Sequence, residues 1–190
     1  PGGLMVMLAE FGTMSLADVL APAIEMAEGY PIEAGTVQRI NDNLHELLKW
    51  PYSKALFVST DSGRMRGPEV GEVFRQPQLK ATLEKLVAAE RAALDAGKDR
   101  KEAIYAAYDR FYRGDIAEEI VRSTREQGGL FTMRDLDEWQ VYIEEPVTTN
   151  YRGIDVYKLT TWTQGPVLLQ TLNILENFDI ASMGYNTVRY

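Results

Sequence analysis

The stretch that decides the fold class is Gln140-Val-Tyr-Ile-Glu-Glu-Pro-Val-Thr-Thr-Asn-Tyr-Arg-Gly-Ile-Asp-Val-Tyr-Lys-Leu159, because the hydrophobic period changes there. Alternating and β-branched residues run from Gln140 to Val147 and again from Gly153 to Leu159. The turn-forming residues 150–153 lie between these two runs. The pattern predicts two neighbouring strands, most simply a β-hairpin.

Helical spacing dominates the chain on both sides of this stretch. Ser15 and Asp18 fit a capping box, and Gly29 is placed to end the same helix. Trp50-Pro51 is expected to stop a later helix, and Thr132 with Asp135 to cap another. Helices are predicted at about 4–11, 15–29, 37–49, 77–97, 100–112, 115–127, 132–138 and 166–177. Between them, a short apolar run at 55–59 is followed by a turn signal at 61–63.

Together these patterns predict an α+β, predominantly helical chain. Residues 1–138 form the helical part, and residues 139–190 form a β-hairpin followed by a helix. No internal repeat or low-complexity segment interrupts this order.

Composition and charge exclude several classes of function. The 190 residues carry a net charge of −8, and no cysteine is present. Nucleic-acid binding normally requires clustered positive charge, so a nucleic-acid partner is not expected. The longest apolar run, 4–9, is far short of the ~20 residues that span a bilayer, so no transmembrane segment is expected. The chain starts without Met, so the natural N-terminus is expected to be missing and the compartment stays open.

The ionisable residues do not form a recognisable catalytic or metal-binding pattern. His45 is the single histidine, which favours a helix-surface or packing role over a triad or metal site. Glu144 and Glu145 are adjacent on the predicted strand, so they should point to opposite faces. The acids at 135, 137 and 138 suit a helix start. No phosphate-binding or dinucleotide-binding motif is present, and neither a metal nor a cofactor is predicted.

The threonine pairs 148–149 and 160–161 lie inside a continuous chain, so they lack the α-amine that activates an N-terminal threonine. Thr163, Gln164 and Gly165 are the substrate-binding candidates, because a loop feeding a helix N-terminus presents free N–H groups to an anion. The alternative interpretation, which we favour, is that Thr163 only starts the helix and that Pro166 occupies its first position.

Many short pieces of the sequence, taken in their order along the chain, resemble the large subunit of the γ-glutamyltranspeptidase family over essentially the whole chain. No single tripeptide is specific, so the resemblance depends on the order of many short pieces. One departure is the stretch 160–166, where the family commonly has a proline-rich, Ser-Ser-Gly-Gly-like sequence. The matching pieces are Pro1-Gly2-Gly3, Phe11–Ile24, Ala27–Pro31, Gln76-Pro77 with Leu79, Phe111–Ala117, Gly128–Leu130, Asp135-Leu136, Glu145-Pro146, Tyr151–Gly153, Val156-Tyr157, Gln164–Pro166 and Leu172–Glu176.

The resemblance implies the αββα sandwich of N-terminal nucleophile hydrolases, of which this chain would be a fragment. It implies a precursor that cuts itself into two subunits and exposes a threonine at the start of the small one. That threonine attacks a γ-glutamyl amide, and the acyl group passes to water or to an amino acid. The nucleophile should lie downstream of this chain and the carboxylate-binding Arg upstream. No catalytic residue can therefore be assigned here, and the segment alone is expected to be inactive.

Three functions are compatible with this sequence. The first is a γ-glutamyl hydrolase or transferase acting on glutathione-like substrates, with the small subunit as obligate partner. The second is a related amide acylase that acts on β-lactam side chains. The third is a helical interaction module without catalysis.

Overall fold

A computed structural model describes residues 1–61 and 63–189. The chain forms two compact units, residues 1–141 and residues 142–190. In the described ranges, long helices and three two-stranded antiparallel sheets make up these units. The predicted α+β, predominantly helical class is confirmed.

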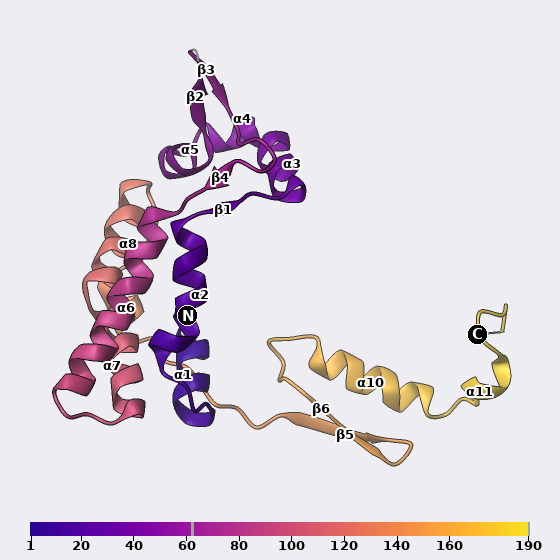
Figure 1. Cartoon of the computed structure of the whole chain (residues 1–190). Helices are drawn as coiled ribbons and strands as arrows, with labels where there is room; N and C mark the ends of the chain where they lie inside the picture. The colour runs from indigo at the N-terminus through magenta and orange to yellow at the C-terminus, as the bar shows by residue number, and fades with distance from the viewer. Residues whose placement is uncertain (62, 190) are drawn as a thin grey trace. The chain divides into compact units, whose positions relative to one another are not determined.

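The first unit is built on a helical bundle (Figure 1). Met5, Ile104, Ala107 and Tyr108 lie at the centre of its core. The long helices α6 and α7 form a hairpin on which α1 and α2 pack. The bundle helices are α1 (Gly2–Phe11), α2 (Leu16–Glu28), α6 (Pro77–Asp95), α7 (Arg100–Arg113), α8 (Asp115–Glu126) and α9 (Met133–Asp137).

The two helix starts predicted from capping boxes are confirmed. The Ser15 side chain accepts from the backbone N–H of Asp18, and the Asp18 carboxylate accepts in return from Ser15. Thr132 and Asp135 repeat this exchange at the start of α9. Both pairs are local in sequence, which is why the pattern alone could find them.

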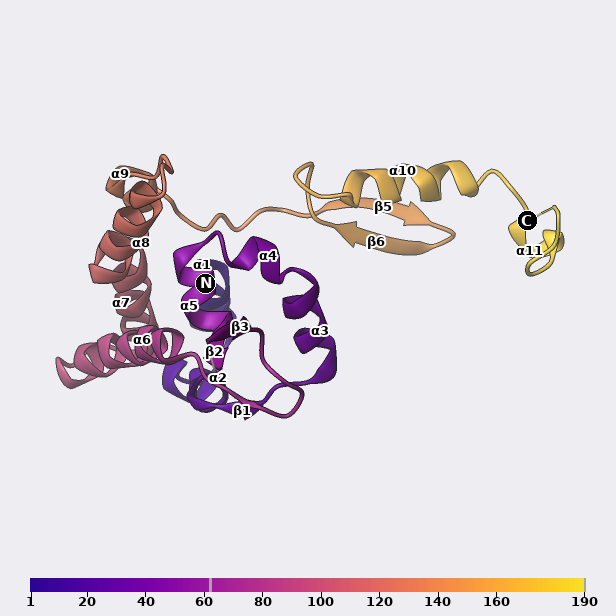
Figure 2. The same ribbon diagram turned by 90° about the horizontal axis from the view of Figure 1, so that it is seen from above.

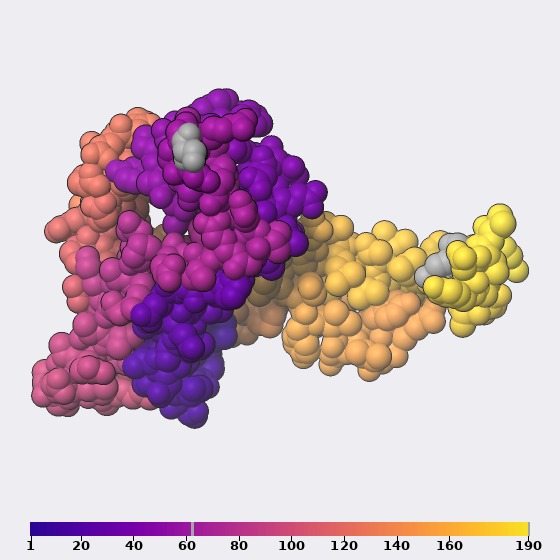
Figure 3. Space-filling view, turned by 45° about the horizontal axis from the view of Figure 1, so that its top comes forward, coloured from indigo at the N-terminus to yellow at the C-terminus, as the bar shows by residue number. Residues whose placement is uncertain are grey.

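Residues 30–74 leave the bundle between α2 and α6 and form a lobe of their own, purple to magenta in Figure 3. Tyr30–Pro31 pairs with Val73–Phe74 at the base, and Ile32, Val37 and Ile40 form a small separate core. The elements of the lobe are β1 (Tyr30–Pro31), α3 (Ala34–Asp42), α4 (Leu44–Leu47), α5 (Pro51–Phe57), β2 (Ser59–Asp61), β3 (Arg64–Arg66) and β4 (Val73–Phe74).

Two predictions for this lobe were wrong. The helix expected at 37–49 begins at Ala34 and breaks at Asn43, whose side chain donates to the Arg39 carbonyl at 2.8 Å. Pro51 does not simply end a helix; it occupies the first turn of α5, where its missing N–H costs nothing. The turn predicted at 61–63 includes Ser62, which lies outside the described residues.

The second unit is a hairpin with a helix packed on one face (Figure 2). β5 (Val147–Tyr151) pairs antiparallel with β6 (Ile154–Lys158), and α10 (Gly165–Leu175) and α11 (Ile180–Met183) follow. Arg152 and Gly153 have φ of 51° and 84°, as a two-residue primed turn requires. The predicted hairpin is confirmed.

The first strand is shorter than predicted. It begins at Val147, and residues 140–146 are not in a strand. Trp139 stacks on Tyr112 in the first unit, with ring centroids 4.8 Å apart, and Val141 packs against the same core. At the other end, Val147 already pairs with Lys158, and the partner strand stops there. The residues before Val147 therefore have no strand to pair with.

Candidate functional site

The three candidate residues at the start of α10 form a local hydrogen-bonded turn. Gln164, not Thr163, is the N-cap, and Pro166 is the second helical residue, not the first. The Thr163 hydroxyl accepts from the N–H of Gly165 at 3.1 Å and donates to the Thr160 carbonyl at 3.1 Å. Pro166 has no N–H to offer. The N–H of Gly165 is thus satisfied within the turn, and a substrate-binding role for residues 163–165 stays a prediction.

Gly165 is needed for close packing between α10 and the end of β6. A Cβ atom at this position would overlap the carbonyl oxygen of Leu159 and lie 2.9 Å from the Cβ of Lys158. Gly165 is itself buried. The glycine therefore has a steric role that is independent of any ligand.

Hydrogen bonds to Glu144 connect the segment before the hairpin to the loop after it. Its carboxylate accepts from the indole N–H of Trp162 at 2.7 Å and from the hydroxyl of Thr160 at 2.8 Å. These hydrogen bonds lower the pKa of Glu144 below its ordinary value. The prediction that Glu144 and Glu145 lie on a strand was wrong, since both precede β5.

The remaining residues considered from sequence are in ordinary positions. Thr148 and Thr149 lie within β5, and the Thr149 hydroxyl bonds to Asn173 of α10 at 2.6 Å. His45 is largely exposed, and its Nε2 lies 3.2 Å from the Glu46 carboxylate. Among the described residues, no group of three or more acidic, histidine or cysteine side chains is placed to hold a metal ion.

A buried carboxylate that the sequence pattern did not reveal holds the corner between α1 and α2. Glu90 of α6 is 2% exposed, and its two carboxylate oxygens accept from the backbone N–H groups of Leu16 at 2.6 Å and Ala17 at 2.8 Å. These N–H groups are at the start of α2, where the helix dipole favours a negative charge.

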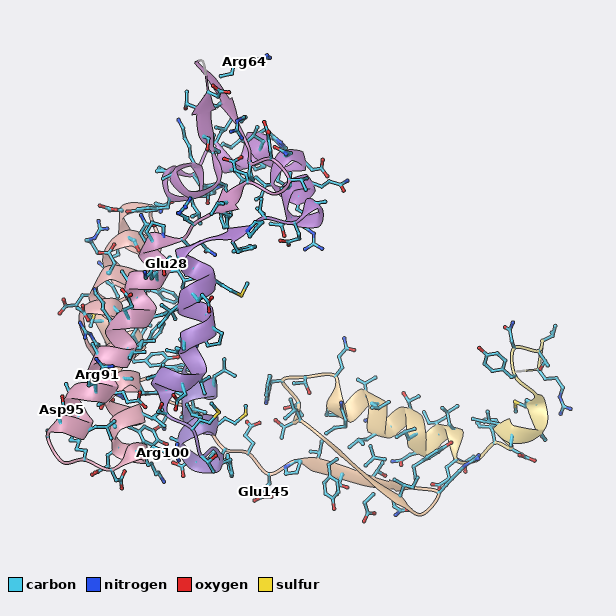
Figure 4. All side chains as sticks on the ribbon, viewed as in Figure 1. Glu28, Arg64, Arg91, Asp95, Arg100 and Glu145 are labelled. Carbon is cyan, nitrogen blue, oxygen red and sulfur yellow. The ribbon has the colours of Figure 1, made fainter. Side chains whose placement is uncertain are left out.

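Arg100, the first residue of α7 (Figure 4), also holds this corner. Its guanidinium donates to the carbonyls of Leu8 at 3.1 Å and Ala9 at 2.9 Å, near the end of α1, and to Met14 at 3.1 Å. The one signal in the sequence is that Glu90 occupies an apolar position of α6, spaced from Leu83, Leu86 and Leu94. We refer to Glu90 and Arg100 together as the corner clasp.

Comparison with models of protein families identifies the family to which the chain belongs. The family model described as gamma-glutamyltranspeptidase matches residues 1–190. The chain belongs to the γ-glutamyltranspeptidase family. The resemblance inferred from the order of short sequence pieces is thereby confirmed.

Curated members of the family have similar sequences. The chain is 32% identical to the glutathione hydrolase-like YwrD proenzyme of Bacillus subtilis over 96% of its length, and 29% identical to the glutathione hydrolase proenzyme of Escherichia coli over 97%. It is 31% identical to the acylase ACY 1 proenzyme of a Pseudomonas species. It spans 31%, 29% and 29% of these three relatives, less than a third of each.

Solved structures agree with the family assignment. The γ-glutamyltranspeptidase of Helicobacter pylori matches with a TM-score of 0.80 and 28% identity, covering 98% of this chain and 48% of that one. The cephalosporin acylase of Bacillus halodurans matches with a TM-score of 0.77 and 28% identity, covering 99% and 32%. The chain thus has part of the N-terminal nucleophile hydrolase fold of this family.

No helix in the described ranges is long and apolar enough to cross a membrane.

Proposed function

We propose that the chain is a segment of the large subunit of an enzyme that cleaves γ-glutamyl amides such as glutathione and transfers the acyl group to water or an amino acid. The single observation that carries this proposal is the family match over residues 1–190. The glutathione hydrolase-like YwrD proenzyme of B. subtilis and the glutathione hydrolase proenzyme of E. coli support the substrate class.

The lengths of the matched structures support the assignment to a large subunit. The same 190 residues cover 48% of the H. pylori chain but only 32% of the acylase chain. This difference is expected if the shorter chain is one product of a cleaved proenzyme and the longer chain is the uncleaved form.

In the proposed mechanism the nucleophile is a threonine outside this chain, at the N-terminus that self-cleavage exposes. Its own α-amine accepts the hydroxyl proton as the oxygen attacks the γ-glutamyl carbonyl. Backbone or side-chain donors stabilise the resulting oxyanion. The amide C–N bond then breaks as the protonated α-amine returns its proton to the departing amine. Water or an amino-acid amine then attacks the acyl-threonine and regenerates the hydroxyl. The isolated segment lacks this threonine and should be inactive.

The hairpin of the second unit gives the segment a structural role in this enzyme. A two-stranded hairpin is at best marginally stable by itself, and each strand of β5–β6 has one unpaired edge within the described residues. We infer that residues 139–190 join the αββα core and pair with strands of the small subunit. Residues 1–138 are then the helical part of the same larger domain.

A second candidate function is that of an amide acylase acting on β-lactam side chains. It is favoured by the 31% identity to the Pseudomonas acylase, which is close to that of the glutathione hydrolases. The match to the cephalosporin acylase of B. halodurans supports the β-lactam substrate class. The two candidates share the fold and the acyl-threonine chemistry, so they differ only in the substrate.

The test is turnover by protein produced from the full-length gene. Release of nitroaniline from γ-glutamyl-p-nitroanilide, with no hydrolysis of a cephalosporin side-chain amide, is the expected result. The reverse preference would replace the first candidate by the second. The 190-residue chain should release no nitroaniline, and turnover by this chain alone would overturn the assignment of the nucleophile.

A further inference from the structure

The lobe formed by residues 30–74 has its own hydrophobic core and joins the bundle at a narrow base. Phe57 of α5 stacks on Phe74 of β4 with ring centroids 5.7 Å apart, and both pack against the small core of the lobe. The antiparallel pair β1–β4 closes the base, beside which the N–H of Gln76 donates to the carbonyl of Ala27 at 2.9 Å. A lobe with a separate core on a two-stranded base has the construction of an element that moves as one body.

The chain enters the lobe through a glycine whose backbone conformation side chains rarely adopt. Gly29, between α2 and β1, has a φ of 154°. A Cβ atom at this position would lie 2.9 Å from Cγ1 of Val73 and 3.2 Å from the Cγ atom of Arg75. Hinges are usually a few residues at the end of an element, and Gly29 has both this place and the required backbone freedom.

Away from the base, a polar cluster connects the lobe to α8. The hydroxyl of Tyr52 donates to the Glu126 carboxylate at 2.7 Å, and it accepts from the guanidinium of Arg122 at 3.5 Å. Arg122 also donates to Glu126 and to Glu119, each at 2.6 Å, so the position of the Glu126 carboxylate is fixed within α8. We call Tyr52, Arg122 and Glu126 the lobe latch.

Between the base and the lobe latch, α5 and the start of α6 are separated by a cavity of about 340 Å³. Figure 3 shows an opening between α8 and the lobe. Side chains around a cavity lack the dispersion contacts of a packed interface, so little besides the latch resists a rotation of the lobe there. The cavity is lined by Tyr52, Ala55 and Leu56 of α5 and by Gln76, Gln78 and Leu79.

We propose that the lobe is a hinged element, which rotates on Gly29 and the β1–β4 base and is held against α8 by the lobe latch. Release of the latch changes the width of the cavity between α5 and α6 without unfolding the lobe. The hydrogen bond from Tyr52 to Glu126 is the contact that sets the balance between the latched and the released positions, because it joins the lobe directly to α8.

The distance between two spin labels tests the hinge. The chain has no cysteine, so Gln38→Cys in α3 and Glu118→Cys in α8 create the two labelling sites of the 190-residue chain. Tyr52→Phe in this background should raise the ratio of released to latched molecules about fivefold, seen as a second distance. Tyr157→Phe, which removes an exposed hydroxyl from β6, is the matched control and should leave the distances unchanged. The same distances with and without the Tyr52 hydroxyl would overturn the proposal.

A second variant and a second measurement separate rotation from unfolding. Glu126→Ala removes the acceptor of the same hydrogen bond, so the double variant should show no larger shift in distance than either single variant. Additive shifts would show that the two residues act separately, and would overturn the latch. Amide hydrogen exchange in α3 should be the same in all variants, because the lobe moves as one body. Faster exchange in α3 would show that the lobe unfolds, and would overturn the hinge.

Discussion

At the scale of single residues, the corner clasp is the least expected feature of the molecule. The carboxylate of Glu90 is buried and accepts two backbone hydrogen bonds at the start of α2. Glu90→Gln keeps the shape but replaces one acceptor oxygen by an N–H₂ group that faces a donor. We expect a loss of about 1–3 kcal/mol in the free energy of unfolding, measured by urea denaturation of the 190-residue chain. Glu84→Gln, on the exposed side of the same helix, is the control and should cost less than about 0.5 kcal/mol.

Asp115 makes a separate prediction about pH. Hydrogen bonds from Arg110 at 3.0 Å and Lys85 at 2.7 Å hold its pKa well below the ordinary value. A depressed carboxyl pKa stabilises the folded state above the unfolded pKa of ~3.9, and this contribution is lost as the pH falls towards the folded pKa. Asp115→Asn should therefore lower the melting temperature at pH 7, and its difference from the wild type should shrink below about pH 4.

The exposed Asp95 at the end of α6 provides the control for this titration. Asp95→Asn should give a melting temperature within a degree or so of the wild type at both pH values. A deficit of Asp115→Asn that stays constant down to pH 3 would show that the ion pairs do not cause it.

Sequence reasoning found the capping boxes of Ser15 and Thr132, whose partners are three positions away, and missed Glu90, whose partners are distant. Ser15 with Asp18 forms a capping box that depends only on local spacing. Glu90 contacts residues 73 and 74 positions away, so its role depends on how α6 and α2 pack. No local pattern could give that contact, although a glutamate at an apolar position of a helix is a signal that can be recognised.

At the scale of elements, the junction between β6 and α10 depends on one glycine. Gly165→Ala would place a methyl group against the Leu159 carbonyl and the Lys158 side chain. We expect α10 to detach from the hairpin, seen as faster amide hydrogen exchange in β5 and β6. Gly35→Ala in α3 is the control, because its Cβ would meet nothing within 4 Å, and it should stabilise the chain by up to about 1 kcal/mol. Unchanged exchange in Gly165→Ala would contradict the steric role.

The elements predicted from sequence were correct where a helix had its own apolar period and cap, as in α2. They were wrong where proline was the main evidence. Pro51 is compatible both with the end of one helix and with the first turn of the next, and the structure shows that it starts α5. Residues 140–146 alternate like a strand but do not form one. Trp139 and Val141 pack within the first unit. Strand β6 ends at Lys158, which already pairs with Val147, so no β6 residue is available to pair with residues 140–146.

At the scale of the whole molecule, the family could be predicted from sequence but the active site could not. The order of many short pieces indicated the family, and the match over residues 1–190 confirms it. Catalysis in the proposed mechanism needs a threonine with a free α-amine, and the threonines of this chain that were considered all lie in its interior. The candidates 163–165 have an internal structural explanation, so the chemistry must be tested on the larger protein.

We propose that this chain is part of a γ-glutamyltranspeptidase-family proenzyme whose nucleophile lies outside residues 1–190. Denaturing intact-mass analysis with N-terminal sequencing of every species, on protein from the full-length gene, tests it most directly. We predict two polypeptides, the longer containing residues 1–190 and the other beginning with threonine. A single uncleaved polypeptide that nevertheless turns over γ-glutamyl-p-nitroanilide would contradict the account.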